Sequence, residues 1–221
     1  MNIKWIVLCL LVVFGIGSLG LNGQVSKAGN TAKSTKPYVP EQLAVTALGS
    51  LKRLKAKIEV GIPYSDYLSV LGDTSYVVND YLDNPVAAKT PYLNSKLRDA
   101  LKAYTLVAQL WKAQIENNGE PFLFCSTDPS IVSGIKWCHD YPESVMPYGG
   151  HNDDSSPSVG VKVLREAAWN VASAKITDAN GLLNHGEPSP KTSSSLPSDE
   201  SSVDIEIRAT IKELRRSGFT N

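Results

Sequence analysis

The sequence predicts an all-α protein: an up-and-down bundle of about four helices, with a disulfide-closed loop and a separate C-terminal helix. Apolar residues recur with a helical period over four long stretches, and short Gly- or Pro-containing connections separate the first three. Two cysteines lie in an aperiodic segment before the fourth stretch. The chain has 221 residues, of which 42% are hydrophobic and 20% charged, which suits one globular domain with tails.

The N-terminal segment has the pattern of a secretory signal peptide. One early cation, Lys4, precedes an apolar run from Trp5 to Ile16, and small residues follow, as cleavage after Gly20 requires. We therefore expect residues 1–20 to be a signal peptide and the mature protein to be exported, to the periplasm or the extracellular side of the cell envelope.

An uncleaved membrane anchor is the alternative for this segment. Residues 5–21 carry no charge and approach the shortest length that spans a bilayer. Residues 21–40 are polar and bounded by proline, so they are expected to be a flexible linker to the folded domain.

The bundle is predicted over residues 41–178, and its first three helices are indicated by their apolar faces and their ends. Gly61 and Pro63 end the first helix. Ser65 is a suitable N-cap for the second. These three helices are expected over residues 41–60, 65–82 and 92–117.

The aperiodic loop, residues 120–158, contains the segment FCSTDPSIVSGIKWCHDYP, in which Cys125 and Cys138 are expected to form a disulfide. Export exposes thiols to an oxidising compartment, where such a pair joins. A metal site with His139 and His151 is the alternative, but the cysteine spacing matches none of the short paired spacings of structural zinc sites. The disulfide would close a short loop and stabilise the protein by roughly 3 kcal/mol.

A closed loop of this kind is pre-organised, which lowers the entropy cost of binding a partner. The residues in and after it that suit binding are Trp137, His139, His151 and Asp153. The sequence supports no metal site, no cofactor and no assigned catalytic residue.

The fourth bundle helix is expected over residues 159–176, followed by a disordered linker over 179–202. Serine and proline dominate the second half of this linker, a composition that does not form a packed core. The terminal segment, 203–217, fits either a strand or a helix; acids at its start and bases at its end favour a helix, either detached or loosely docked.

Three motifs carry a resemblance to a known group: EVGIPYSDY at 59–67, AQLW at 108–111 and AAWNVA at 167–172. Over about 41–118 and 160–176 the chain resembles uncharacterised exported helical proteins of bacteria, common in cyanobacteria. The resemblance rests on packing motifs, so it implies a helical fold and export, and no activity.

The composition argues against a nucleic-acid partner, because 22 basic residues balance 22 acidic ones. We expect a non-enzymatic envelope protein that binds or scaffolds another envelope protein or a polymer. The alternatives are an enzyme of unrecognised type, using carboxylates with His139 or His151, and a structural protein tethered to the membrane by residues 5–21.

Overall fold

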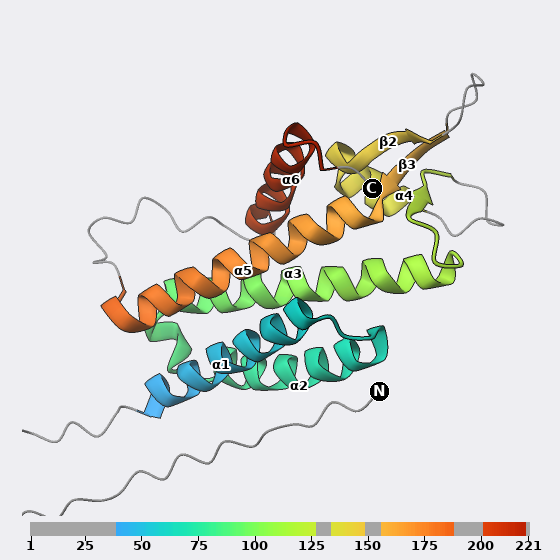
Figure 1. Ribbon diagram of the computed structural model, residues 1–221. Helices are drawn as coiled ribbons and strands as arrows, with labels where there is room; N and C mark the ends of the chain where they lie inside the picture. The colour runs from blue at the N-terminus through green and yellow to red at the C-terminus, as the bar shows by residue number, and fades with distance from the viewer. Residues whose placement is uncertain (1–38, 127–133, 149–155, 188–200, 220–221) are drawn as a thin grey trace, which may run out of the picture. The chain divides into compact units, whose positions relative to one another are not determined.

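The computed structural model describes residues 39–126, 134–148, 156–187 and 201–219 (Figure 1). The described part is mostly helical and contains one small sheet, which confirms the predicted all-α class. The predicted signal peptide, most of the polar linker, His151 and Asp153 lie outside the described residues.

Four long helices form the bundle and alternate in direction along the chain (Figure 1). The first three lie close to their predicted bounds, and a single turn of 3-10 helix, η1 (Ala87–Lys89), precedes the third. Gly61 ends the first helix with a φ of 81°, a left-handed conformation that glycine adopts at no steric cost. The four helices are α1 (Val39–Val60), α2 (Tyr64–Leu82), α3 (Pro91–Glu116) and α5 (Val161–His185).

The core consists of the apolar faces that the helical period predicts. Leu51, Leu97 and Leu164 are fully buried, and each side chain of this size contributes about 2 kcal/mol through burial. Tyr67 is also buried, and its hydroxyl donates a hydrogen bond to the backbone carbonyl of Tyr104 (2.8 Å), so no polar atom of the phenol is left unpaired.

α5 is longer than predicted, because it continues through His185 into the segment assigned to a disordered linker. Ile176 and Ala179 extend its buried face. Beyond its end, the carboxylate of Glu187 accepts hydrogen bonds from the backbone N–H groups of Tyr92 (3.1 Å) and Leu93 (2.8 Å) and so caps α3. The prediction of disorder from residue 179 is therefore wrong up to Glu187.

The terminal segment forms a separate helix, α6 (Ser201–Arg216), as predicted. It packs on α5 and is not detached. Val203, Ile207 and Ile211 are spaced one turn apart and all are buried, because they present one apolar face to the bundle.

The segment predicted as an aperiodic loop folds into a small cap at the end of the bundle where α5 begins (Figure 1). Its three strands form an antiparallel sheet in the order β1-β3-β2. They are short, and β3 has the sequence SPSVG, whose Pro, Ser and Gly are atypical of strands, so the sequence pattern does not indicate them. We call this unit the disulfide cap; it comprises β1 (Phe122–Phe124), α4 (Ile135–Asp140), the 3-10 turn η2 (Pro142–Ser144), β2 (Val145–Tyr148) and β3 (Ser156–Gly160).

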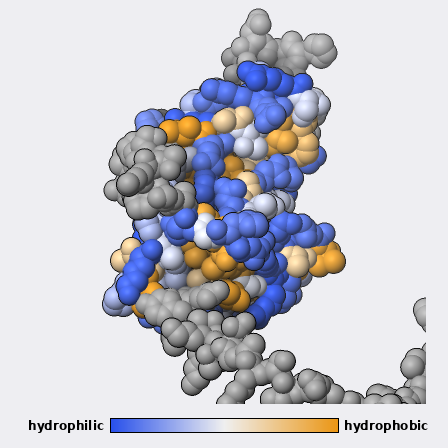
Figure 2. Space-filling model, turned by 90° about the vertical axis from the view of Figure 1, so that its left-hand side faces the viewer, coloured by the Kyte–Doolittle hydropathy of each residue, from blue (hydrophilic) through white to orange (hydrophobic). Residues whose placement is uncertain are grey.

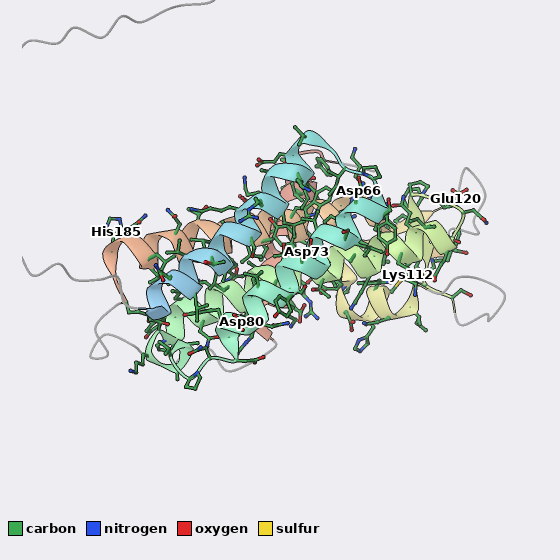
Figure 3. The ribbon with its side chains drawn as sticks, turned by 90° about the horizontal axis from the view of Figure 1, so that it is seen from below. Asp66, Asp73, Asp80, Lys112, Glu120 and His185 are labelled. Atoms are coloured by element: carbon green, nitrogen blue, oxygen red, sulfur yellow. A yellow bond between two sulfur atoms is a disulfide. The ribbon has the colours of Figure 1, made fainter. Side chains whose placement is uncertain are left out.

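The outer surface is largely polar. Asp66, Asp73 and Asp80 are exposed and follow one another along α2 at intervals of two turns (Figure 3). On the face shown in Figure 2, hydrophobic residues lie in separate patches between hydrophilic ones. None of the helices in the described residues is both long enough and apolar enough to cross a membrane.

Candidate functional site

The disulfide joins Cys125, just after β1, to Cys138 in α4, with 5.9 Å between their Cα atoms, as predicted. The backbone N–H of Cys125 also donates to the carbonyl of Pro157 (2.9 Å), and that of Gly134 to Phe124 (2.7 Å). Gly134 is required at its position, because a Cβ there would lie 2.6 Å from the carbonyl oxygen of Leu123. The cap is thus held by covalent and backbone contacts around a small apolar centre.

The described residues of the predicted binding set do not form a site. Trp137 is only 6% exposed and packs on the ring of Tyr141 (centroids 6.4 Å apart), so it belongs to the core and offers no face to a ligand. The side chain of His139 is 88% exposed and contacts only Asp140 (3.0 Å) among the described residues. His151 and Asp153 lie outside the described residues.

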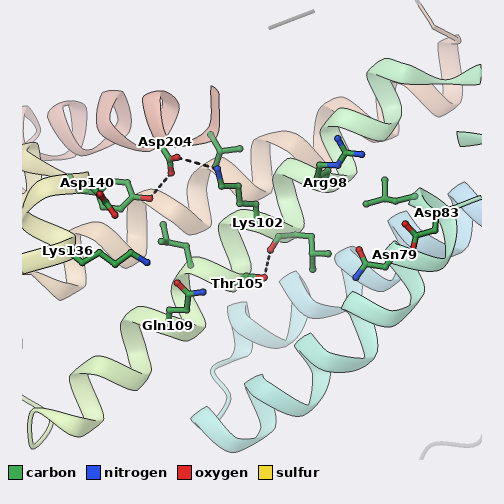
Figure 4. Close-up of a pocket in the computed structure, with 14 residues that line it drawn as sticks. Asn79, Asp83, Arg98, Lys102, Thr105, Gln109, Lys136, Asp140 and Asp204 are labelled. Carbon is green, nitrogen blue, oxygen red and sulfur yellow. Dashed lines mark hydrogen bonds and ion pairs between the residues drawn. The ribbon is translucent and has the colours of Figure 1, made fainter. Parts of the chain in front are cut away.

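A groove of about 630 Å³ lies beside the cap and is a candidate binding site. We call it the α3 groove. Its floor is the outward face of α3, and its walls are the C-terminal end of α2 on one side and the cap with the start of α6 on the other (Figure 4). The floor residues follow the helical period: Arg98, Leu101, Lys102, Thr105, Leu106 and Gln109.

One wall of the α3 groove is a fixed network around Asp204, in the first turn of α6. Its carboxylate accepts a hydrogen bond from the Tyr141 hydroxyl (2.7 Å) and pairs with Lys102 Nζ (3.3 Å) (Figure 4). Burial, reinforced by the negative charge of Asp204, raises the pKa of Tyr141, so the phenol stays neutral and keeps donating. This network ties α3, the cap and α6 together.

The rest of the α3 groove offers polar groups without a fixed partner. In the described part of the chain, the side chains of Asn79, Arg98 and Gln109 form no hydrogen bond or ion pair. Figure 4 places Arg98 near Asn79 and Asp83 at one end of the groove, and Lys136 near Gln109 and Asp140 at the other. Each end therefore presents a cation, an amide and a carboxylate.

The described lining of the α3 groove holds few of the side chains that most often act in catalysis. Its described lining contains no His, Cys or Ser, and its one threonine, Thr105, donates its hydroxyl proton to the carbonyl of Leu101 (2.9 Å). The hydroxyl that does lie beside a base is that of Tyr141, which donates to Asp204 (2.7 Å), and the raised pKa of this phenol makes it a poor nucleophile. Nor does the described part of the chain hold a cluster of three His, Cys, Asp or Glu side chains able to bind a metal ion.

The α3 groove is not indicated by any sequence motif. Its floor is the more polar face of α3, beside the face that is buried in the core. From the sequence, a polar face of an amphipathic helix is expected to be exposed to solvent. Only the packing of the cap and α6 beside α3 turns that face into a groove.

Comparison with known proteins identifies no relative: no family model, no curated protein and no solved structure matches the chain. The resemblance to exported helical proteins of bacteria therefore stays a prediction.

Proposed function

We propose that this protein is an exported, non-enzymatic binding protein of the cell envelope whose ligand occupies the α3 groove. The observation that carries the proposal is that Asn79, Arg98 and Gln109 have no partner among the described residues, in a groove that three separate units of the chain build together: α2 with α3, the disulfide cap, and α6. A site assembled from several elements around a few polar groups is typical of a binding pocket.

The ligand that fits this lining best is a polypeptide segment with charges of both signs. Arg98 and Lys136 suit carboxylates, Asp83 suits a cation, and the side-chain amides of Asn79 and Gln109 suit peptide groups. A polyanion is disfavoured, because Asp83, Asp140 and Asp204 would face it along the groove.

Export is supported by the signal-like N-terminal segment and by the disulfide, since disulfides persist in oxidising compartments. The mature N-terminus, measured by mass spectrometry on protein from the producing cell, tests this. A terminus at or near Leu21 is expected. An intact residue 1–20 segment would favour the membrane-tethered alternative, and a fully reduced Cys125 and Cys138 would contradict export.

Site-specific photo-crosslinking in the envelope tests the groove itself. A photoreactive amino acid at Gln109 lies on the groove floor, whereas the same residue at Tyr76, which is 77% exposed on α2 and outside the groove, is the matched control. We expect a protein adduct from position 109 only, and its loss when Arg98→Glu and Lys136→Glu reverse the charges at both ends. Identical adducts at both positions, or none at 109, would contradict the proposal.

The disulfide provides a second test, because the cap supplies one wall of the α3 groove. In the Cys125→Ser/Cys138→Ser variant, we expect the adduct at position 109 to fall while the far-ultraviolet circular dichroism keeps its helical signal. The reason is that the cross-link joins two parts of the cap and neither cysteine lies in a bundle helix. Unchanged crosslinking in this variant would remove the cap from the binding site.

A further inference from the structure

Arg165, in the second turn of α5, lies between two indole rings. Its guanidinium carbon is 5.4 Å from the ring centroid of Trp111 on α3 and 5.3 Å from that of Trp169, one turn further along α5. Contact with both rings restricts the guanidinium, so part of the conformational entropy of this long side chain is already lost before anything binds.

The charge of Arg165 is not neutralised by an ion pair. Among the described residues its only hydrogen bond is a long one, from Nη1 to Gln114 Oε1 (3.4 Å), although a guanidinium has five N–H donors. Burial lowers the pKa of Arg165, and the neighbouring Glu166 opposes that shift without pairing with it. Glu166 instead lines a separate small cavity with Lys55 and Ser173.

Exposed apolar side chains share helix faces with Trp111 and with the ring that packs on it. The ring of Tyr64 lies on Trp111 (centroids 5.4 Å apart). Leu68, one turn after Tyr64, is 43% exposed, and Ile115, one turn after Trp111, is 50% exposed. Arg165 is therefore a cation without an ion-pair partner among the described residues, and exposed aliphatic groups lie one helical turn from the aromatic rings beside it.

We propose that Arg165 and its two tryptophans bind the carboxylate of an apolar segment, such as a peptide whose last residue is aliphatic. A carboxylate accepts two parallel hydrogen bonds from a guanidinium, and this pair is stronger than a neutral hydrogen bond. The aliphatic end of the ligand would cover Leu68 and Ile115, which are exposed without it.

This carboxylate site is distinct from the α3 groove and does not depend on it. Trp111 follows Gln109 by two residues, which is about 200° around the helix, so the two side chains leave opposite faces of α3. Arg165, Trp111 and Trp169 are all absent from the lining of the α3 groove.

Nuclear magnetic resonance of the indole N–H groups tests the site directly in the ¹⁵N-labelled full chain. Trp111 and Trp169 report on it, and Trp137, buried in the cap, is the internal control. The probes are N-acetyl-leucine, N-acetyl-leucinamide and inorganic phosphate. We expect the acid to shift the Trp111 and Trp169 signals, leave Trp137 in place, and bind at least about tenfold more tightly than the amide.

Two outcomes of this titration overturn the proposal. Equal affinities for the acid and the amide would show that the charge of Arg165 takes no part in binding. Tighter binding of phosphate than of the acid would show that the site is a general anion site without a preference for an apolar carboxylate.

Variants at Arg165 separate binding from folding. Arg165→Gln is expected to abolish the shifts, while Arg98→Gln, the matched change in the α3 groove, leaves them intact. Arg165→Lys keeps the charge and the ring contact but loses the two-pronged geometry, so about a tenfold weaker response to the acid is expected even if the glutamine variant does not fold. Full affinity in either variant at position 165 would overturn the proposal.

Discussion

Two cations on α5, Lys175 and Arg165, are buried to different degrees and have opposite surroundings. The side chain of Lys175 is 4% exposed and lies between the carboxylates of Asp99 (3.7 Å) and Glu206 (2.5 Å). Arg165 is half-buried between aromatic rings and has no carboxylate partner among the described residues. A charge taken out of water is costly unless it is paired. Lys175 therefore has a structural role, whereas the charge of Arg165 is available to be paired by the carboxylate of a ligand.

The pairing of Lys175 also has a structural consequence, because its partners come from different helices. Asp99 belongs to α3 and Glu206 to α6, so this lysine joins three helices where the apolar face of α6 is buried. Burial raises the pKa of Asp99, Lys175 opposes that shift, and Glu206 adds to it.

The largest effect should follow from removing the paired cation. Lys175→Met leaves Asp99 and Glu206 facing each other without a counter-charge, and we expect the free energy of unfolding to fall by about 3 kcal/mol. Urea unfolding measures this. Lys57→Met, an exposed lysine on α1, is the control and should change stability by less than about 0.5 kcal/mol. A loss as small as the control's would show that the Lys175 cluster does not hold α6.

The matched substitution at the unpaired cation should cost less. Arg165→Met removes two contacts with indole rings but strands no carboxylate, so the expected loss is about 1 kcal/mol in the same urea assay. If Arg165→Met instead destabilised the protein as much as Lys175→Met, Arg165 would be a structural cation as well, and the contrast between the two residues would fail.

The pH dependence of stability should report on Asp99. Its folded-state pKa lies above its unfolded value, so the folded protein holds this proton more tightly, and ionisation of Asp99 lowers stability as the pH rises through and above the ordinary range of a carboxyl group. Asp99→Asn removes that contribution. Relative to wild type, the variant should therefore gain stability as the pH rises, in urea titrations at several pH values. A difference that stays constant with pH would mean that the pKa of Asp99 is not raised.

The smallest effect is expected for a neighbouring pair that is partly exposed to water. Lys96 and Asp178 lie 2.9 Å apart, but their side chains are 29% and 51% exposed, so water already solvates both charges. Lys96→Met should reduce the free energy of unfolding by no more than about 0.5 kcal/mol. A loss comparable with that of Lys175→Met would show that the contribution of an ion pair to stability here does not depend on how deeply the pair is buried.

Much of the fold was predictable because its signals are local. The apolar period places the bundle helices, Gly61 marks the end of α1, and the ordering of acids and bases along α6 favours a helix there. The disulfide was predictable from two cysteines in a chain whose N-terminal segment predicts export.

The errors occur where a residue's partner is far away in the sequence. In the sequence, Glu187 lies in a segment predicted to be a linker, but its carboxylate caps α3, almost a hundred residues earlier in the chain. Trp137 looks available to a ligand in the sequence, yet the cap buries it. The strands of the cap are too short for a periodic signal, and they form through the pairing of β1 and β2 with β3 beside the disulfide.

By itself, the sequence determined the helical class of this protein, the ends of its first helices and the cross-link, since each depends on neighbouring residues or on residue type. Only the tertiary structure decided which polar groups lack a partner. Lys175 and Arg165 are both basic residues ten positions apart on one helix. Whether each is neutralised depends on what α3 and α6 place beside it, and that follows from packing between distant parts of the chain.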